Sequence, residues 1–186
     1  MQPTSRISKG HLRGVCNVYC LLLALVCARP LHAAEGAGPT QVLNLPPAAF
    51  GAAHNEAHFV IEEGGLGRLC SIQGAAYFVA PLLLEDGAVI ERVSAFVQDK
   101  SKESFALISV VRRTPEESEL LAISPVSSGG RDLETLSTGP IAAPVIDNQH
   151  YSYLLQVVLT GPKVCLSGAQ VAYRKPLTPH QDASEK

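Results

Sequence analysis

Residues 151–161, Tyr-Ser-Tyr-Leu-Leu-Gln-Val-Val-Leu-Thr-Gly, constrain the fold most, because their composition fits only a buried β-strand. Large apolar side chains occupy every odd position from Tyr151 to Leu159, and this period of two is typical of a strand and not of a helix. A second apolar segment, 164–173, follows the break Gly161-Pro162-Lys163, which predicts a hairpin between the two strands. A two-stranded hairpin is barely stable alone, so we expect both strands in a larger sheet. The other face of the first strand carries Ser152, Leu154, Gln156 and Val158.

The rest of the chain repeats this pattern of short apolar segments separated by turn residues. Asp86-Gly87 predicts a tight turn, and Pro46-Pro47 limits the first segment to an edge or terminal strand. Residues 114–118 offer a single helical turn as an alternative to the short strand at 120–123. The remaining expected strands are 40–45, 57–62, 68–72, 75–80, 89–98, 105–111 and 133–137.

These segments number about nine or ten, at spacings of about 8 to 15 residues, and no long helix accompanies them. This pattern predicts an all-β protein with a single antiparallel β-sandwich over residues 40–174. A jelly roll is the preferred topology. An immunoglobulin-like Greek key is the alternative, and it comes second because the tryptophan and cysteine spacing of true immunoglobulin domains is missing.

The N-terminus has the order of a secretory signal peptide. A basic segment without acids, which contains Arg6, Lys9 and Arg13, precedes an apolar stretch at 15–28. That stretch is shorter than the roughly twenty residues that cross a bilayer as a helix, so a retained membrane anchor is the weaker alternative. We predict a signal peptide at 1–33, a tether at 34–39 and a disordered tail at 175–186. The mature protein is then exported, to the periplasm or the extracellular space, without a membrane span.

Three of the five cysteines lie in the predicted leader, which leaves Cys70 and Cys165 in the mature domain. Each lies within an apolar strand pattern. An exported protein with two cysteines most simply forms one structural disulfide, so we predict a Cys70–Cys165 bond. Two buried free thiols are the alternative.

The charge of the mature domain excludes two classes of partner. Loss of residues 1–33 removes four basic side chains and no acidic one, so 11 basic and 17 acidic side chains remain. A mildly acidic chain without a run of Lys or Arg has no electrostatic footprint for nucleic acid or for an anionic membrane. Tryptophan is absent and aromatic residues make up 5% of the chain, which counts against a sugar-binding platform of flat rings.

Three segments resemble a pattern found in uncharacterised exported bacterial β-sandwich proteins. They are Pro-Leu-Leu-Leu-Glu-Asp-Gly-Ala-Val-Ile at 81–90, Asp-Asn-Gln-His-Tyr-Ser-Tyr at 147–153 and Gly-Ala-Gln-Val-Ala-Tyr at 168–173. The resemblance covers residues 40–174 and consists of turn and core positions. It therefore implies a fold, and it implies no activity, cofactor or catalytic residue.

The segment with the most metal-like spacing contains His54 and His58, four residues apart. A zinc site needs a third or fourth protein ligand, for which Glu62, Asp147 and His150 are candidates if the fold brings them near. A polar loop before a strand explains the two histidines more simply, so we predict no metal and no other cofactor.

Other motifs of catalysis are missing from the sequence. It contains no Gly-x-Ser-x-Gly elbow and no recognisable triad. The turn Asp147-Asn148 is explained by side chains that bond their own backbone. The pair Tyr151 and Tyr153 either faces a ligand or packs at a strand end.

Two classes of function remain. We predict a non-catalytic exported protein with a binding or structural, envelope-associated role, whose partner is a protein or an envelope component. The alternative is a small hydrolase or metal-dependent enzyme with a loop-built site around His54, His58 and His150. Whether these three histidines converge in one pocket distinguishes the two classes.

Overall fold

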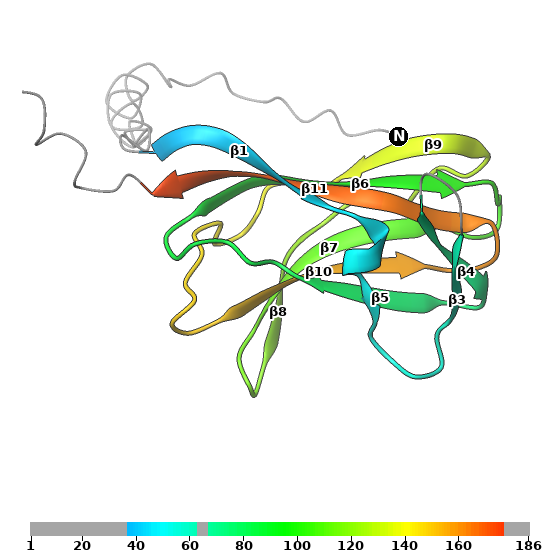
Figure 1. Ribbon diagram of the computed structural model, residues 1–186, viewed down its shortest axis with the longest axis horizontal. Coiled ribbons are helices and arrows are strands. Elements are labelled where there is room, and N and C mark those ends of the chain that lie inside the picture. The colour runs from blue at the N-terminus through cyan, green and yellow to red at the C-terminus, as the bar shows by residue number, and fades with distance from the viewer. Residues whose placement is uncertain (1–36, 63–66, 177–186) are drawn as a thin grey trace, which may run out of the picture. The chain divides into compact units, whose positions relative to one another are not determined.

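The computed structural model describes residues 37–62 and 67–176. Within these ranges the chain forms eleven strands and one 3-10 helix, η1 (Pro47–Ala49). The strands form two antiparallel sheets that lie one above the other (Figure 1). The predicted signal peptide at 1–33 lies outside the described residues, as do residues 177–186 of the predicted tail.

Sheet A has six strands in the order β3-β4-β11-β6-β9, with β1 also beside β11, and sheet B has five in the order β2-β5-β10-β7-β8. The strands of sheet A are β1 (Ala37–Leu45), β3 (His58–Glu62), β4 (Arg68–Gln73), β6 (Val89–Asp99), β9 (Arg131–Ser137) and β11 (Val164–Pro176). Those of sheet B are β2 (Gly51–Ala52), β5 (Ala76–Pro81), β7 (Ala106–Arg113), β8 (Ser118–Ile123) and β10 (Ser152–Leu159).

The pairing of strands β4 to β11 is nested, which identifies a jelly roll. β7 pairs with β8, β6 with β9, β5 with β10 and β4 with β11, so a long antiparallel ribbon is rolled into two sheets. The predicted fold class is therefore confirmed, and the immunoglobulin-like alternative is not adopted. The strands extend beyond the predicted limits of 40 and 174, because β1 begins within the expected tether and β11 continues into the expected tail.

The hairpin predicted between residues 151–161 and 164–173 is wrong, although both segments are strands. β10 pairs with β5 and β7 in sheet B, whereas β11 belongs to sheet A. The connection between them crosses from one sheet to the other beside the connection from β6 to β7. The amide of Thr160 donates to the carbonyl of Phe105 at 3.0 Å, and the amide of Lys100 donates to that of Lys163 at 3.2 Å. β10 therefore lies between β5 and β7, and β11 lies between β4 and β6, so the two strands do not pair with each other.

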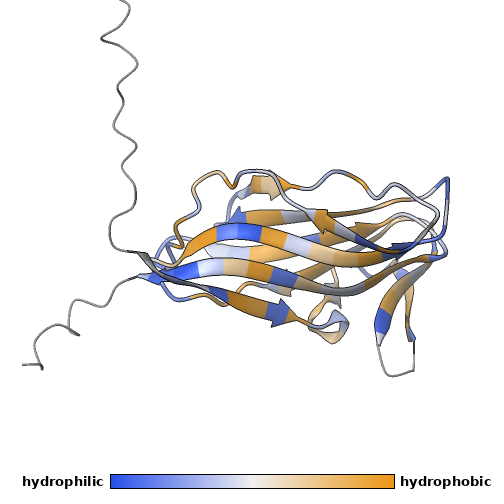
Figure 2. Ribbon diagram, turned by 90° about the horizontal axis from the view of Figure 1, so that it is seen from above, coloured by the Kyte–Doolittle hydropathy of each residue, from blue (hydrophilic) through white to orange (hydrophobic). Residues whose placement is uncertain are grey.

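The core lies between the sheets and follows the predicted alternation. The odd positions of β10 are buried and most even positions face outward. β6 departs from strict alternation near its start, where a register shift opposite β11 lets both Ile90 and Val93 face the core. Alternating hydrophobic and hydrophilic residues are visible along the long strands of sheet A (Figure 2). The largest fully buried side chains include Phe78, Leu155 and Leu166.

Three local predictions have clear outcomes. Gly87 has φ of 76° in the predicted Asp-Gly turn, a conformation that glycine adopts without steric cost. Strand 105–111 is an inner strand of sheet B, as its two apolar faces indicated. The helical turn considered for 114–118 is absent, because β8 already begins at Ser118.

The predicted disulfide is confirmed. Cys70 on β4 and Cys165 on β11 are directly opposite each other, with their Cα atoms 4.0 Å apart and 95 residues between them in sequence. Both side chains are buried. The bond ties the β3–β4 hairpin to the centre of sheet A.

Candidate binding groove on the outer face of sheet B

A shallow hollow crosses the outer face of sheet B, the face that points away from the core. We call it the outer groove; its volume is about 270 Å³. The strand register sets Leu154 opposite Val111 and Gln156 opposite Val79, so these side chains form adjacent rows across β5, β10 and β7. The floor is thus aliphatic, with polar groups beside it. The lining residues are Ala53, Val79, Val111, Arg113, Ser118, Leu154 and Gln156.

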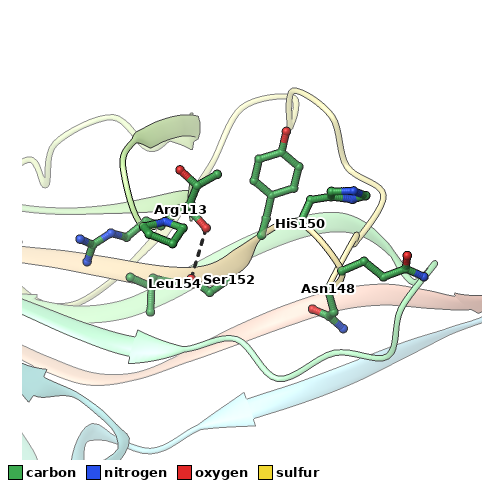
Figure 3. A pocket seen from close by; sticks show the side chains of 9 residues that line it. Arg113, Asn148, His150, Ser152 and Leu154 are labelled. Carbon is green, nitrogen blue, oxygen red and sulfur yellow. Dashed lines mark hydrogen bonds between the residues drawn. The ribbon is translucent and has the colours of Figure 1, made fainter.

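The outer groove continues into a larger pocket at the end of the sheet, which we call the end pocket. This pocket has a volume of about 560 Å³ and shares Arg113 and Leu154 with the outer groove. Figure 3 shows Arg113 on one side and His150 with Asn148 on the other. The two hollows therefore form one continuous surface. The end pocket is lined by Arg113, Thr114, Pro115, Asn148, Gln149, His150, Tyr151, Ser152 and Leu154.

The wall of the end pocket that precedes β10 is a turn at residues 147–151, held from two sides. The amide of Asn148 donates to the carboxylate of Asp86 at 2.7 Å, and its side-chain amide donates to the carbonyl of Leu84 at 2.9 Å. The buried hydroxyl of Tyr153 accepts a hydrogen bond from the amide of Asp147 at 3.0 Å. The turn is therefore fixed to both the core and the connection that follows β5, which preorganises this wall.

The tyrosine pair divides into one core residue and one residue of the pocket. Tyr153 is buried, whereas Tyr151 is half-buried and lines the end pocket. The two rings meet edge to face at a centroid distance of 6.4 Å, and the guanidinium of Arg112 lies 4.3 Å from the centroid of Tyr151. Arg112 is held in turn by Glu119, whose carboxylate accepts from Nε at 2.7 Å and raises the pKa of Arg112. These contacts fix the ring orientation of Tyr151.

His150 forms an acid–base pair with Asp147 at the mouth of the end pocket. Its Nδ1 atom lies 2.8 Å from a carboxylate oxygen, and this hydrogen bond is the main reason why the pKa of Asp147 lies below its usual range. The nearby hydroxyl of Ser152 instead donates to the backbone carbonyl of Arg113 at 3.4 Å (Figure 3). A nucleophile must contact its base, and among the described residues no hydroxyl is hydrogen-bonded to His150.

The three histidines proposed for an enzymatic site do not converge. His54 contacts Tyr77 edge to face at 5.6 Å between centroids, and Tyr77 pairs with Val158 near the end of β10. His150 lies just before the start of β10, roughly 20 Å away along the strand at about 3.3 Å per residue. His58 is exposed at the start of β3.

A metal centre built on histidine has no counterpart in 37–62 and 67–176. Within these ranges the sole group of three or more His, Cys, Asp and Glu ligand atoms close to one another is Glu62, Cys70 and Cys165. Both cysteines of that group are already joined in the disulfide.

No pattern in the sequence marks Arg113, Val79 or Val111 as part of a site. These residues are far apart in sequence and meet only because β5, β10 and β7 are neighbours. One signal was available: the outward face of residues 151–161 mixes Leu154 with Gln156, a combination unlike that of a plain solvated face.

The sequence matches no family model and no curated protein. Distantly similar solved structures include a family 6 carbohydrate-binding module from Clostridium cellulolyticum in complex with xylose, at 12% identity and a TM-score of 0.47, covering 68% of this chain and 94% of the module. Another is the xylan-binding module CBM15, at 11% identity and a TM-score of 0.45, covering 72% of this chain and 97% of that one.

A third similar structure contains the CBM22-1 and GH10 modules of a Clostridium thermocellum xylanase with xylohexaose, at 13% identity and a TM-score of 0.47. The match covers 77% of this chain but only 29% of that longer chain. Similarities this distant carry no ligand, activity or partner over to this chain, and the resemblance to exported bacterial β-sandwich proteins stays a prediction. Within the described residues no helix is long and apolar enough to span a membrane.

Proposed function

We propose that the protein is a non-catalytic exported binding protein that holds an extended segment of a partner protein along the outer groove. The observation that carries the proposal is the combination of an aliphatic floor at Val79, Val111 and Leu154 with the exposed guanidinium of Arg113 in one continuous surface. No acidic side chain of the described residues forms an ion pair with Arg113.

The chemistry of this surface favours a peptide ligand with alternating side chains. An extended chain directs every second side chain to one face, so aliphatic residues two apart would contact adjacent rows of the groove floor. The planar guanidinium of Arg113 binds a carboxylate through two parallel hydrogen bonds, which favours an acidic residue at one end of the segment.

The end pocket supports binding in preference to catalysis. The hydroxyl of Ser152 is engaged by a backbone carbonyl, and the ring of His150 is engaged by Asp147. Hydrolysis by a serine nucleophile would need these two side chains to contact each other. The Asp147–His150 pair instead adds hydrogen-bonding groups to the rim.

The disulfide supports an exported location. Cys70 and Cys165 form a buried structural bond between two central strands, and such bonds persist in oxidising compartments and are rare in the cytosol. This agrees with the basic and then apolar order of the N-terminus, from which we propose a cleaved leader.

A carbohydrate is the second candidate ligand. The ring of Tyr151 lies in the end pocket together with the amide side chains of Asn148 and Gln149, and rings flanked by amides suit a sugar. This hypothesis places the ligand in the end pocket, whereas the peptide hypothesis places it along the outer groove. The two hollows share Arg113 and Leu154, but Val79 and Val111 line the outer groove alone and Tyr151 lines the end pocket alone.

Nuclear magnetic resonance titration of isotope-labelled protein separates the candidates. The probes are xylohexaose and a set of short peptides that alternate aliphatic residues and end in glutamate. With the peptides we expect saturable shifts around Val79 and Val111, which line the outer groove and not the end pocket. Leu154→Asp should abolish this binding, and Arg113→Gln should weaken it about tenfold. Arg92→Gln, an exposed arginine of sheet A, is the matched control. Saturation by xylohexaose and not by the peptides, with shifts centred on Tyr151, would show that the ligand is a carbohydrate and that the peptide proposal is wrong.

A further inference from the structure

The edge strand β3 of sheet A exposes an apolar surface. It pairs with β4 on one side, and within residues 37–62 and 67–176 no strand pairs with its other side. Three consecutive side chains are exposed, Phe59 at 37%, Val60 at 44% and Ile61 at 46%. Edge strands are often protected by lysine or proline, and the five residues of β3 contain neither.

We propose that β3 pairs with β3 of a second copy of this chain, antiparallel about a two-fold axis at Val60. Such a pairing joins the two A sheets edge to edge and covers the exposed apolar side chains. Symmetry sets Val60 opposite its own copy, Phe59 opposite Ile61, and His58 opposite Glu62. Every residue of the short strand then faces a residue of compatible chemistry.

The backbone N–H and C=O groups of β3 have the orientation that this pairing needs. The Cα atoms of Cys70 and Cys165 lie only 4.0 Å apart, as in a pair that exchanges no backbone hydrogen bonds. The N–H and C=O groups of Cys70 therefore point away from β11 and toward Val60, its partner on β3. Because these groups alternate along a strand, those of Phe59 and Ile61 point to the free edge. Across the two-fold axis, Phe59 and Ile61 exchange both of their hydrogen bonds.

The side chains on the two faces of β3 are also complementary. On one face, the ring of Phe59 packs edge to face on the buried ring of Phe78 at 5.2 Å, so a pair with Ile61 of the second copy extends the core across the interface. On the other face, His58 meets the carboxylate of Glu62, which already forms an ion pair with Arg68. Opposite polar partners in a close cross-strand pair stabilise a sheet, and like charges destabilise it.

Sedimentation velocity of the purified protein tests the dimer at up to about 100 μM, a range suited to a small interface. We expect a concentration-dependent dimer, and Val60→Lys should raise its dissociation constant about tenfold or more because two lysines then face each other. Val42→Lys, at an exposed position of 54% on the edge strand β1, is the matched control and should leave the dimer intact. Circular dichroism confirms that each variant is folded.

A charge exchange tests the register. In His58→Glu, the new glutamate of each copy faces Glu62 of the other copy. In Glu62→Lys, the new lysine of each copy faces His58 of the other copy. Each variant alone should therefore associate weakly. A mixture of the two should restore association, because the new glutamate then faces the new lysine and the second pair is the original one between His58 and Glu62. A wild-type monomer at the highest concentration, a dimer that Val60→Lys leaves unchanged, or a mixture no stronger than its components overturns the proposal. Slow hydrogen exchange of the Phe59 and Ile61 amides in a monomer also overturns it, and assigns the edge to another segment of this chain.

Discussion

Removal of the disulfide by the double substitution Cys70→Ala and Cys165→Ala should destabilise the domain strongly. The bond closes a loop across a sequence separation of 95 residues. In the chain-entropy model, opening a loop of this length in the unfolded state costs about 4.7 kcal/mol of stability. Globular domains have a total unfolding free energy of only about 5 to 15 kcal/mol, so the loss is a large fraction of the whole.

The structure adds a local effect to this global one. β4 pairs with β11 at only two positions, Cys70 with Cys165 and Leu69 with Leu166. Without the bond, the β3–β4 hairpin is held to the rest of the domain by this short contact, by the hydrogen bond from Arg68 to Gln98 and by the packing of Phe59 on Phe78. Amides of β3 and β4 should therefore exchange with solvent faster than those of β10, which has long pairings on both sides.

Urea unfolding measures the global effect, with the variant compared with oxidised and reduced wild-type protein. Reduction of the wild type should lower the midpoint about as much as the double substitution, and reductant should not change the midpoint of the variant. A loss of less than about 1 kcal/mol would refute the entropic argument, since the predicted effect is several times larger. If reductant lowers the midpoint of the variant as much as that of the wild type, the reductant acts on something other than the Cys70–Cys165 bond.

Three further outcomes are expected. Leu155→Ala, at a fully buried position of β10, should lower the unfolding free energy by about 2 to 5 kcal/mol in a denaturant titration. Gly129→Ala should lower the melting temperature more than Gly130→Ala, because both have positive φ near 72° but only the first sets a Cβ against backbone atoms. His150→Ala should raise the pKa of Asp147 toward its ordinary value, as measured by a pH titration followed by nuclear magnetic resonance. The hydrogen bond of Asp147 with His150 stabilises the folded turn at pH values above the ordinary carboxyl pKa. This stabilisation is lost as the pH falls through the lowered pKa of Asp147.

Strand positions could be predicted from the sequence because alternation is a local property. Residues 151–161 and 164–173 alternate strongly, and both form strands. The disulfide was also predictable, since only two cysteines lie outside the predicted leader. Both predictions depend on composition over a few residues or on simple counting, and neither requires knowledge of which strands are neighbours.

Strand partners could not be predicted in the same way. The break Gly161-Pro162-Lys163 indicates a change of direction, which a hairpin and a crossing between sheets share. The choice is made by hydrogen bonds to the neighbouring connection, from Thr160 to Phe105 and from Lys100 to Lys163. These contacts join residues about 55 to 63 positions apart in sequence, a separation at which local patterns carry no information.

The candidate site could not be predicted for the same reason, because its residues come from strands that are far apart in sequence.

The position of the outer groove also bears on the proposed dimer. The outer groove lies on sheet B, whereas the free edge of β3 belongs to sheet A, so pairing through β3 leaves both grooves open. A two-fold axis through an antiparallel strand pair is perpendicular to the sheet, so the two B sheets lie on the same side of the joined A sheets. Both grooves of a dimer would then face one way. A partner with repeated segments, or an array of partners, would engage both at once, and the second contact becomes intramolecular. Val60→Lys should therefore weaken binding to a tandem peptide more than binding to a single one.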